Sequence, residues 1–133
     1  LPGVKVLQFS AWEMLQKEMT QADAYNVFYT GTHDNRTLVS WYAAEAETQG
    51  SPPNAVQQRR FCRQIMARLY AVDAWWVIFP LQDVLGLDDR SRMNTPSKPE
   101  GNWGWRVGME QLTEETAAWL RELCERHNRL PEA

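Results

Sequence analysis

The sequence lacks several features that each define a class of protein. No apolar run approaches the ~20 residues of a membrane-spanning helix, and the N-terminus does not have the layout of a signal peptide. A basic excess, typical of nucleic-acid-binding proteins, is also missing, because the net charge is −3 and the pI is about 5.4. We therefore expect neither a membrane nor a nucleic acid as a partner.

Cysteine is scarce, and metal-binding patterns are missing. Only Cys62 and Cys124 occur, without the spacing of a zinc site. Each lies in a helical pattern with apolar neighbours, so we expect free thiols and a reducing, cytoplasmic location. The chain also has no Gly-rich phosphate loop, no Ser-His-Asp set and no metal-ligand cluster. Phosphate binding, serine catalysis and metal chemistry thus find no support.

The sequence does contain the composition of a globular domain, with an excess of tryptophan. Hydrophobic residues make up 44% and charged residues 23%, and 133 residues fit one domain. Seven tryptophans occur, at positions 12, 41, 75, 76, 103, 105 and 119. The chain opens without Met in "LPGVKVLQF", a strand pattern already under way. We therefore expect a piece of a longer protein.

Strand-like and helix-like segments alternate along the chain. Residues 4–9, 26–31 and 74–80 predict strands, and residues 11–22, 37–49, 55–72 and 114–128 predict helices. This order indicates an α/β fold, a parallel sheet with helices packed outside it. The run 74–80 is apolar throughout, so we expect it to be covered on both faces, with Trp75 or Trp76 in the core.

Two polar loops follow the second and third predicted strands. The first is "GTHDNRT" (31–37), and the second covers residues 82–107. In parallel α/β proteins, functional groups lie on loops at the carboxyl ends of strands. We therefore expect these two loops to share one rim of the sheet.

His33 and Asp34 in the first loop can bind a sugar. A carboxylate beside an imidazole can bind vicinal hydroxyls, and it can stabilise the oxocarbenium-like state of glycosyl transfer. In the alternative interpretation, Asp34 caps the helix beginning near Thr37 while His33 is hydrogen-bonded inside a turn. The residues alone leave both roles open.

The second loop carries further candidates, each with a structural alternative. Asp83 occupies the same position relative to its strand as Asp34 does, but it could simply cap the turn "VLGL". Asn94 and Arg92 are polar groups that could equally be turn residues. Trp103 and Trp105 could stack on sugar rings or pack in a core.

Five blocks, in this order, resemble the signatures of the 4-α-glucanotransferases, also called amylomaltases or disproportionating enzymes. The blocks are "LPGVKVLQF", "VFYTGTHDNRT", "PLQDVLGL", "RMNTP" and "EGNWGWR". This resemblance covers essentially the whole chain. It implies a TIM-type (β/α)₈ barrel, of which residues 1–133 would be the last three βα units, a partial barrel.

The resemblance also implies a reaction and a site. The family transfers α-1,4-glucan segments between maltooligosaccharides by a retaining mechanism, without a metal or organic cofactor, and its substrates are of the starch or glycogen type. Asp34 then matches the transition-state stabiliser, His33 matches a substrate-binding histidine of subsite −1, and Asn94 matches a substrate-binding loop asparagine expected near the glucan. The nucleophile and the acid/base would lie upstream of Leu1. The isolated fragment should be inactive and should self-associate through its cut barrel surfaces.

Some positions depart from the family pattern, and two other functions remain open. Arg36 replaces an acidic or amide residue, "GLD" replaces "GLG", and Ser97 replaces a glycine. One alternative is a non-catalytic glucan-binding module that uses Trp103, Trp105 and the His-Asp loop. The other is a small self-contained glycosidase with Asp34 and Asp83 as its carboxylate pair.

Overall fold

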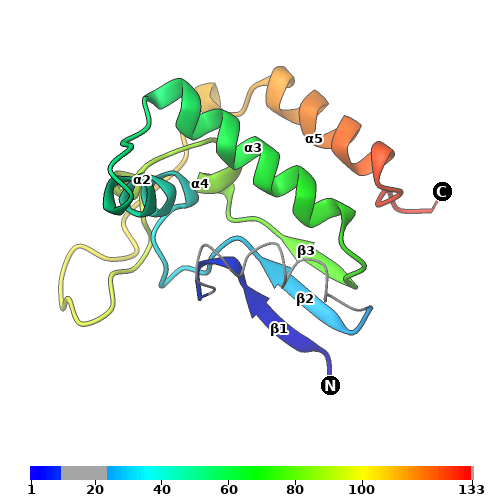
Figure 1. Ribbon diagram of the computed structural model, residues 1–133, viewed down its shortest axis with the longest axis horizontal. Helices are drawn as coiled ribbons and strands as arrows, with labels where there is room; N and C mark the ends of the chain where they lie inside the picture. The colour runs from blue at the N-terminus through cyan, green and yellow to red at the C-terminus, as the bar shows by residue number, and fades with distance from the viewer. Residues whose placement is uncertain (10–23, 133) are drawn as a thin grey trace.

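The computed structural model describes residues 1–9 and 24–132, which form an α/β fold (Figure 1). The strands are β1 (Gly3–Val6), β2 (Asn26–Tyr29) and β3 (Trp76–Ile78). The helices are α2 (Leu38–Thr48), α3 (Ala55–Ala71), α4 (Leu81–Val84) and α5 (Glu114–Arg126), with short 3₁₀ turns η1 (Leu7–Phe9), η3 (Asp89–Ser91) and η4 (Met109–Gln111). The helix expected over 11–22 lies outside the described residues.

The three strands form one parallel sheet in the order β1-β2-β3. Val27 in β2 pairs with Val4 on one side and with Trp76 on the other. This confirms the parallel sheet that the alternation of strands and helices predicted. Because all three strands point the same way, their carboxyl ends lie at one edge, where the two polar loops begin.

The core lies between one face of the sheet and the helices. Figure 1 shows α3 running along the sheet, with α5 beyond it. Phe28 of β2 is only 1% exposed, and α3 contributes buried side chains at helical spacing. The core residues are Leu7, Phe28, Leu38, Val39, Trp41, Cys62, Ile65, Met66, Leu69 and Ala74. Trp41 packs in this core, and Trp119 packs against it.

The opposite face of the sheet is open. Val4 is 66% exposed and Trp76 is 59% exposed, and Trp75 just before β3 is also exposed. The prediction that β3 is covered on both faces, with Trp75 or Trp76 in the core, is therefore wrong. The physical reason is that only one side of β3 packs against the core cluster, through Val77, whereas Trp76 and Ile78 on the other side are exposed.

Short polar side chains cap the starts of the helices. Thr37 caps α2 by accepting a hydrogen bond from the Ser40 N–H (3.4 Å). Asn54 and Gln57 form a capping box at the start of α3, and Thr113 caps α5. In the last helix Leu123 is buried, whereas Leu120, Cys124 and His127 are half-buried.

The C-terminal arm returns to the turn between α3 and β3. The Arg129 guanidinium donates hydrogen bonds to the carbonyls of Tyr70 (2.8 Å), Val72 (2.7 Å) and Ala74 (3.1 Å). It also lies over the Tyr70 ring. One side chain therefore satisfies carbonyls that the end of α3 and the following turn leave without helical partners.

Both cysteines are free thiols, as predicted. Cys62 is buried, and burial raises the pKa of its thiol to about 12, so it is an inert core group. Cys124 is half-buried, with its sulfur 3.8 Å from the Tyr70 hydroxyl. Among the described residues, no helix combines the length and apolar character needed to cross a membrane.

Candidate active-site rim

The loop 31–37 after β2 is held in shape by its own side chains. The Asn35 carboxamide oxygen accepts hydrogen bonds from the Thr32 N–H and the Thr32 hydroxyl, both at 2.8 Å. The Thr32 hydroxyl in turn accepts from the Asp34 N–H (3.3 Å). Such local side-chain bonds are typical of Asx and Ser/Thr turns. They leave the side chains of His33 and Asp34 about half exposed at the rim.

The Asp34 carboxylate is bound by both loops of the rim. Its Oδ1 lies 3.3 Å from His33 Nε2 and accepts a hydrogen bond from Asn94 Nδ2 at 2.6 Å. Asp34 does not cap α2, because Thr37 performs that role. The helix-cap interpretation of Asp34 is therefore wrong, and its carboxylate faces the second loop instead.

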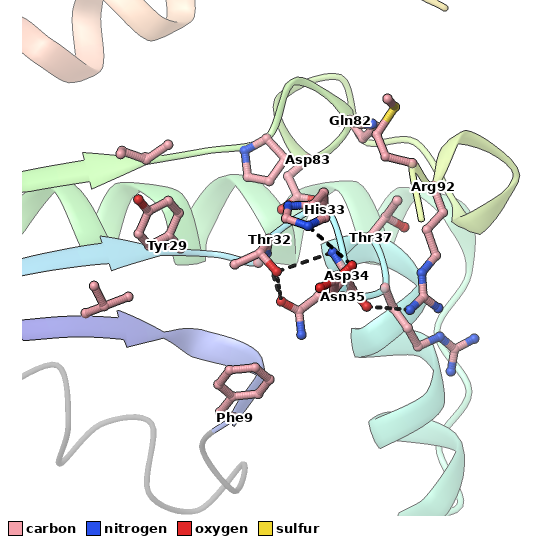
Figure 2. A pocket seen from close by; sticks show the side chains of 16 residues that line it. Phe9, Tyr29, Thr32, His33, Asp34, Asn35, Thr37, Gln82, Asp83 and Arg92 are labelled. Atoms are coloured by element: carbon pink, nitrogen blue, oxygen red, sulfur yellow. Dashed lines mark hydrogen bonds and ion pairs between the residues drawn. The ribbon is translucent and has the colours of Figure 1, made fainter. Parts of the chain in front are cut away.

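The second loop contributes backbone contacts as well as Asn94. The Asn94 N–H donates to the His33 carbonyl (3.2 Å). Arg92 donates from Nη2 to the Asp34 carbonyl (2.6 Å) and from Nε to the Asn94 carbonyl (2.8 Å). Figure 2 shows Arg92 reaching the His33–Asp34 loop from the neighbouring segment. The prediction that the two loops share one rim is confirmed.

Arg92, one of the polar candidates of the second loop, contacts backbone groups of both loops. Its guanidinium donates to one carbonyl in each loop, so it fixes their spacing. Its position two residues before Asn94 places Arg92 in the second loop. Nothing in the sequence specifies which backbone carbonyls its guanidinium contacts.

Only one of the two loop tryptophans lies at the rim. The Trp103 ring is 53% exposed, and its centroid lies 5.1 Å from that of His33. Its backbone N–H donates to the Met93 carbonyl, which closes the neck of the loop 93–103. Trp105 instead lines a separate cavity with Val39 and Leu87. Trp103 can therefore offer an aromatic face beside His33, whereas Trp105 cannot.

Asp83 lies beneath this rim and is 1% exposed. Its Oδ2 accepts from the Thr30 hydroxyl (2.6 Å), and its Oδ1 accepts from the Leu38 N–H (2.7 Å). The predicted cap of the following turn is therefore wrong, because Asp83 lies within α4 and its oxygens bind residues far along the chain. Burial raises the pKa of this carboxyl to about 6, against the opposing effect of the two hydrogen bonds. Both oxygens are engaged by protein donors, which disfavours the glycosidase that pairs Asp34 with Asp83.

The loops border a hollow of about 690 Å³, a size typical of small-molecule sites. Its wall combines the polar residues of loop 31–37 with apolar side chains that include Phe9, Tyr29 and Ile78 (Figure 2). A carboxylate, an imidazole and an aromatic ring at one rim can bind a polyhydroxylated ring by hydrogen bonds and stacking. Within residues 1–9 and 24–132, no group of three or more His, Cys, Asp or Glu residues could hold a metal ion.

The positions that depart from the family pattern have defined structural roles. Arg36 forms an ion pair with Asp89 (2.7 Å), and Asp89 also accepts from the Thr37 N–H (2.9 Å). Asp88 caps η3 and binds Arg90, whose guanidinium lowers the pKa of this carboxyl. Ser97 has a φ of 68°, the left-handed conformation that favours the glycine expected there.

Parallel strands whose carboxyl ends carry a loop-built site of polar groups define the chain as an α/β protein with its binding groups on one rim. Residues 1–112 match the sequence model of the 4-alpha-glucanotransferases. The chain belongs to this family.

Individual relatives agree. The chain is 33% identical to the 4-alpha-glucanotransferase of Streptococcus pneumoniae over 98% of its own length, which is 27% of that protein. It is 40% identical to the chloroplastic/amyloplastic 4-alpha-glucanotransferase of Oryza sativa subsp. japonica, over 97% of the chain and 23% of that protein. The structure also resembles an amylomaltase from Streptococcus agalactiae solved in complex with acarbose, with a TM-score of 0.80 and 28% identity, covering 98% of this chain and 28% of that one. The chain thus spans about a quarter of the length of these proteins.

Proposed function

We propose that residues 1–133 form the C-terminal part of the catalytic domain of a 4-α-glucanotransferase, contributing three βα units to a (β/α)₈ barrel. The parallel order of β1, β2 and β3 supports this proposal. The open apolar face of the sheet supports it too, since the inner face of a barrel is covered only when the remaining strands are present. Relatives about four times as long supply room for those strands.

The proposed reaction is the transfer of α-1,4-glucan segments between maltooligosaccharides with retention of configuration. Asp34 would bind hydroxyls of the sugar at subsite −1 and stabilise the positive charge of the oxocarbenium-like transition state. His33 and Asn94 would hold the same sugar. The nucleophile and the acid/base would come from the part of the protein that precedes Leu1, so this chain alone would not turn over.

The hydrogen bond from Asn94 to Asp34 is the observation that carries the proposal. It joins two side chains that are 60 positions apart in the sequence at the carboxyl ends of neighbouring strands. A carboxylate that only stabilised the fold could remain buried, as Asp83 does, but Asp34 is half exposed beside the hollow. Together with the family match, this geometry favours a sugar-binding carboxylate.

The test is a maltotriose disproportionation assay that follows glucose release. The 133-residue chain should be inactive alone and active after it is combined with the preceding part of the same protein. In that combined enzyme, Asp34→Asn should lower kcat by roughly 10²–10³-fold, since a neutral amide cannot stabilise the developing charge. Asp88→Asn makes the same change on a carboxylate that binds Arg90, and it should leave the rate unchanged. Turnover by the isolated chain, lost in Asp34→Asn, would show that the chain holds a complete site.

A non-catalytic glucan-binding module is the second candidate, and Trp103 favours it. The exposed ring beside His33 is a stacking surface that needs no catalytic carboxylates. A module should bind maltoheptaose saturably, with a change in tryptophan fluorescence that Trp103→Ala removes and Trp75→Ala preserves. If the chain is instead a partial barrel of three βα units, its incomplete rim should bind maltoheptaose weakly or not at all.

The remaining proposals concern the state of the chain. The two free thiols support a reducing compartment such as the cytoplasm. The exposed side chains of Val4, Trp75 and Trp76 support self-association of the isolated chain. Sedimentation at increasing concentration should detect this association, and a monomer at all concentrations would contradict it.

A further inference from the structure

Asp83 binds both ends of the loop that carries His33 and Asp34. Thr30, which donates to Asp83 Oδ2, directly follows β2. Leu38, whose N–H donates to Asp83 Oδ1, is the first residue of α2. The loop 31–37 lies between these two residues, so a single buried carboxylate fixes the points where the loop leaves the strand and enters the helix.

We propose that the ionised Asp83 carboxylate is a positioning residue for Asp34, setting the place of the loop 31–37 and thereby the contact of Asp34 with Asn94. This inference rests on the proposed function for its effect on catalysis. Its structural part concerns the loop alone. Asp83 itself contacts protein donors and is not assigned a direct contact with substrate.

The charge of Asp83 matters because of what its two oxygens bind. An ionised carboxylate accepts from both donors, and it lies at the positive N-terminal end of α2. On protonation, Oδ2 becomes a donor, and the Thr30 hydroxyl must reverse its role and accept. Both bonds then lose their charge assistance and lengthen. Thus we expect the two ends of the loop to shift when Asp83 takes up a proton.

The surroundings of Asp83 oppose its charge. Desolvation by burial is the largest effect, and the nearby Asp89 carboxylate acts in the same direction. On its other side Asp83 borders a cavity of about 250 Å³, which is also lined by Cys62, Arg59, Arg63 and Glu115. The Arg63 guanidinium is paired with Glu115. Asp83 is therefore ionised at neutral pH in the folded chain, and its buried charge lowers the free energy of unfolding.

Asp83→Asn separates the positioning role from a role in stability. The amide oxygen can accept from Leu38, while the amide nitrogen donates to Thr30, which is the bonding pattern of the protonated acid. The variant is thus a permanent copy of the low-pH state, without a buried charge. If Asp83 positions the loop, the variant should have a displaced loop and be no less stable than the wild type. If Asp83 only stabilises the fold, the variant should keep the loop in place and be less stable.

The experiment is a ¹H–¹⁵N NMR titration of the 133-residue chain from pH 8 to pH 5. It uses a His33→Gln background, so that no imidazole lies beside Asp34. The Leu38 backbone amide and the Asn94 side-chain amide should shift together with a midpoint near pH 6. In Asp83→Asn both signals should already lie at their low-pH positions at pH 8 and should not titrate. Asp88→Asn should retain the transition.

Two outcomes would overturn the proposal. The first is an Asn94 signal that does not move between pH 8 and pH 5. The second is an Asp83→Asn variant whose loop signals match the wild type at pH 8 while its urea midpoint falls. If Asp83→Asn does not fold, Thr30→Val and Thr30→Ser replace it. Valine removes the hydroxyl bond and should displace the same signals, whereas serine keeps the bond and should not.

The catalytic consequence is read separately in the combined enzyme. Asp83→Asn should lower kcat by roughly tenfold to hundredfold with KM nearly unchanged, because a misplaced group loses transition-state contacts. Failure of the proposed function would appear as no glucan transfer by the wild type, which leaves the NMR result intact. A wild-type rate in Asp83→Asn would overturn the positioning role even if transfer is confirmed.

Discussion

The loop 31–37 and the open face of the sheet are neighbours. They differ in how many of their groups are bound or covered by other parts of the chain. The ends, the backbone and the side chains of the loop are bound by groups from α4 and the second loop. The open face carries Val4, Trp76 and Ile78 exposed to solvent. The described residues therefore bind their own part of the rim, and none of them forms a layer that covers the open side of the sheet.

The largest expected effect compares the two faces of the sheet. Phe28→Ala should lower the free energy of unfolding by about 3–5 kcal/mol, because the ring is 1% exposed in the core. Trp76→Ala on the open face should change it by less than ~0.5 kcal/mol. Urea unfolding at low protein concentration measures both. An equally large loss in Trp76→Ala would mean that a second copy or another segment covers the open face.

The next prediction concerns pH. The folded pKa of Asp83 is about 6 against an ordinary 3.8, so between these values the folded chain holds more protons than the unfolded chain. Asp83 should therefore lower the free energy of unfolding by on the order of 3 kcal/mol as pH rises from about 4 to 6, with no further change above. Asp88, with its lowered pKa, acts in the opposite direction, but its exposure makes that effect small.

Urea unfolding from pH 4.5 to pH 8 checks the sign. The difference between the wild type and Asp83→Asn should grow as pH rises toward 6 and level off above it, with the variant the more stable at pH 8. A difference that stays constant with pH would mean that Asp83 carries the same charge in the folded and unfolded chains throughout this range.

The smallest expected effect lies in the second loop. Ser97 has a φ of 68°, which glycine adopts freely and other residues do not. Ser97→Gly should raise the free energy of unfolding by about 0.5–1 kcal/mol, measured by thermal unfolding. Ser51→Gly makes the same change where φ is not positive, and it should lower stability slightly.

The parts of the molecule that the sequence predicted correctly depend on local chemistry. The helices predicted over 37–49, 55–72 and 114–128 correspond to α2, α3 and α5, and the alternation of strands and helices indicated the parallel sheet. The roles of His33, Asp34 and Asn94 stayed open on the residues alone. The resemblance to a family suggested those roles, and their convergence at one rim follows from parallel strand ends.

The parts that were missed depend on long-range contacts. The partners of Asp83 are 53 and 45 positions away. Local sequence patterns therefore did not predict that its carboxylate joins a strand end to a helix start. Trp75 and Trp76 are apolar enough for any core, but hydrophobicity does not reveal whether a second layer is present. Arg92 illustrates the same limit, because backbone carbonyls carry no sequence signature.

The three carbonyl bonds of Arg129 affect how this protein can be shortened. The family match ends at residue 112, yet the guanidinium 17 positions later holds the turn from which β3 starts. A version trimmed at the end of the match would lose α5 and leave the carboxyl end of α3 without its cap. The shortest useful version of this chain therefore extends through residue 129. The part of the chain that the family model covers is therefore smaller than the part that has to fold.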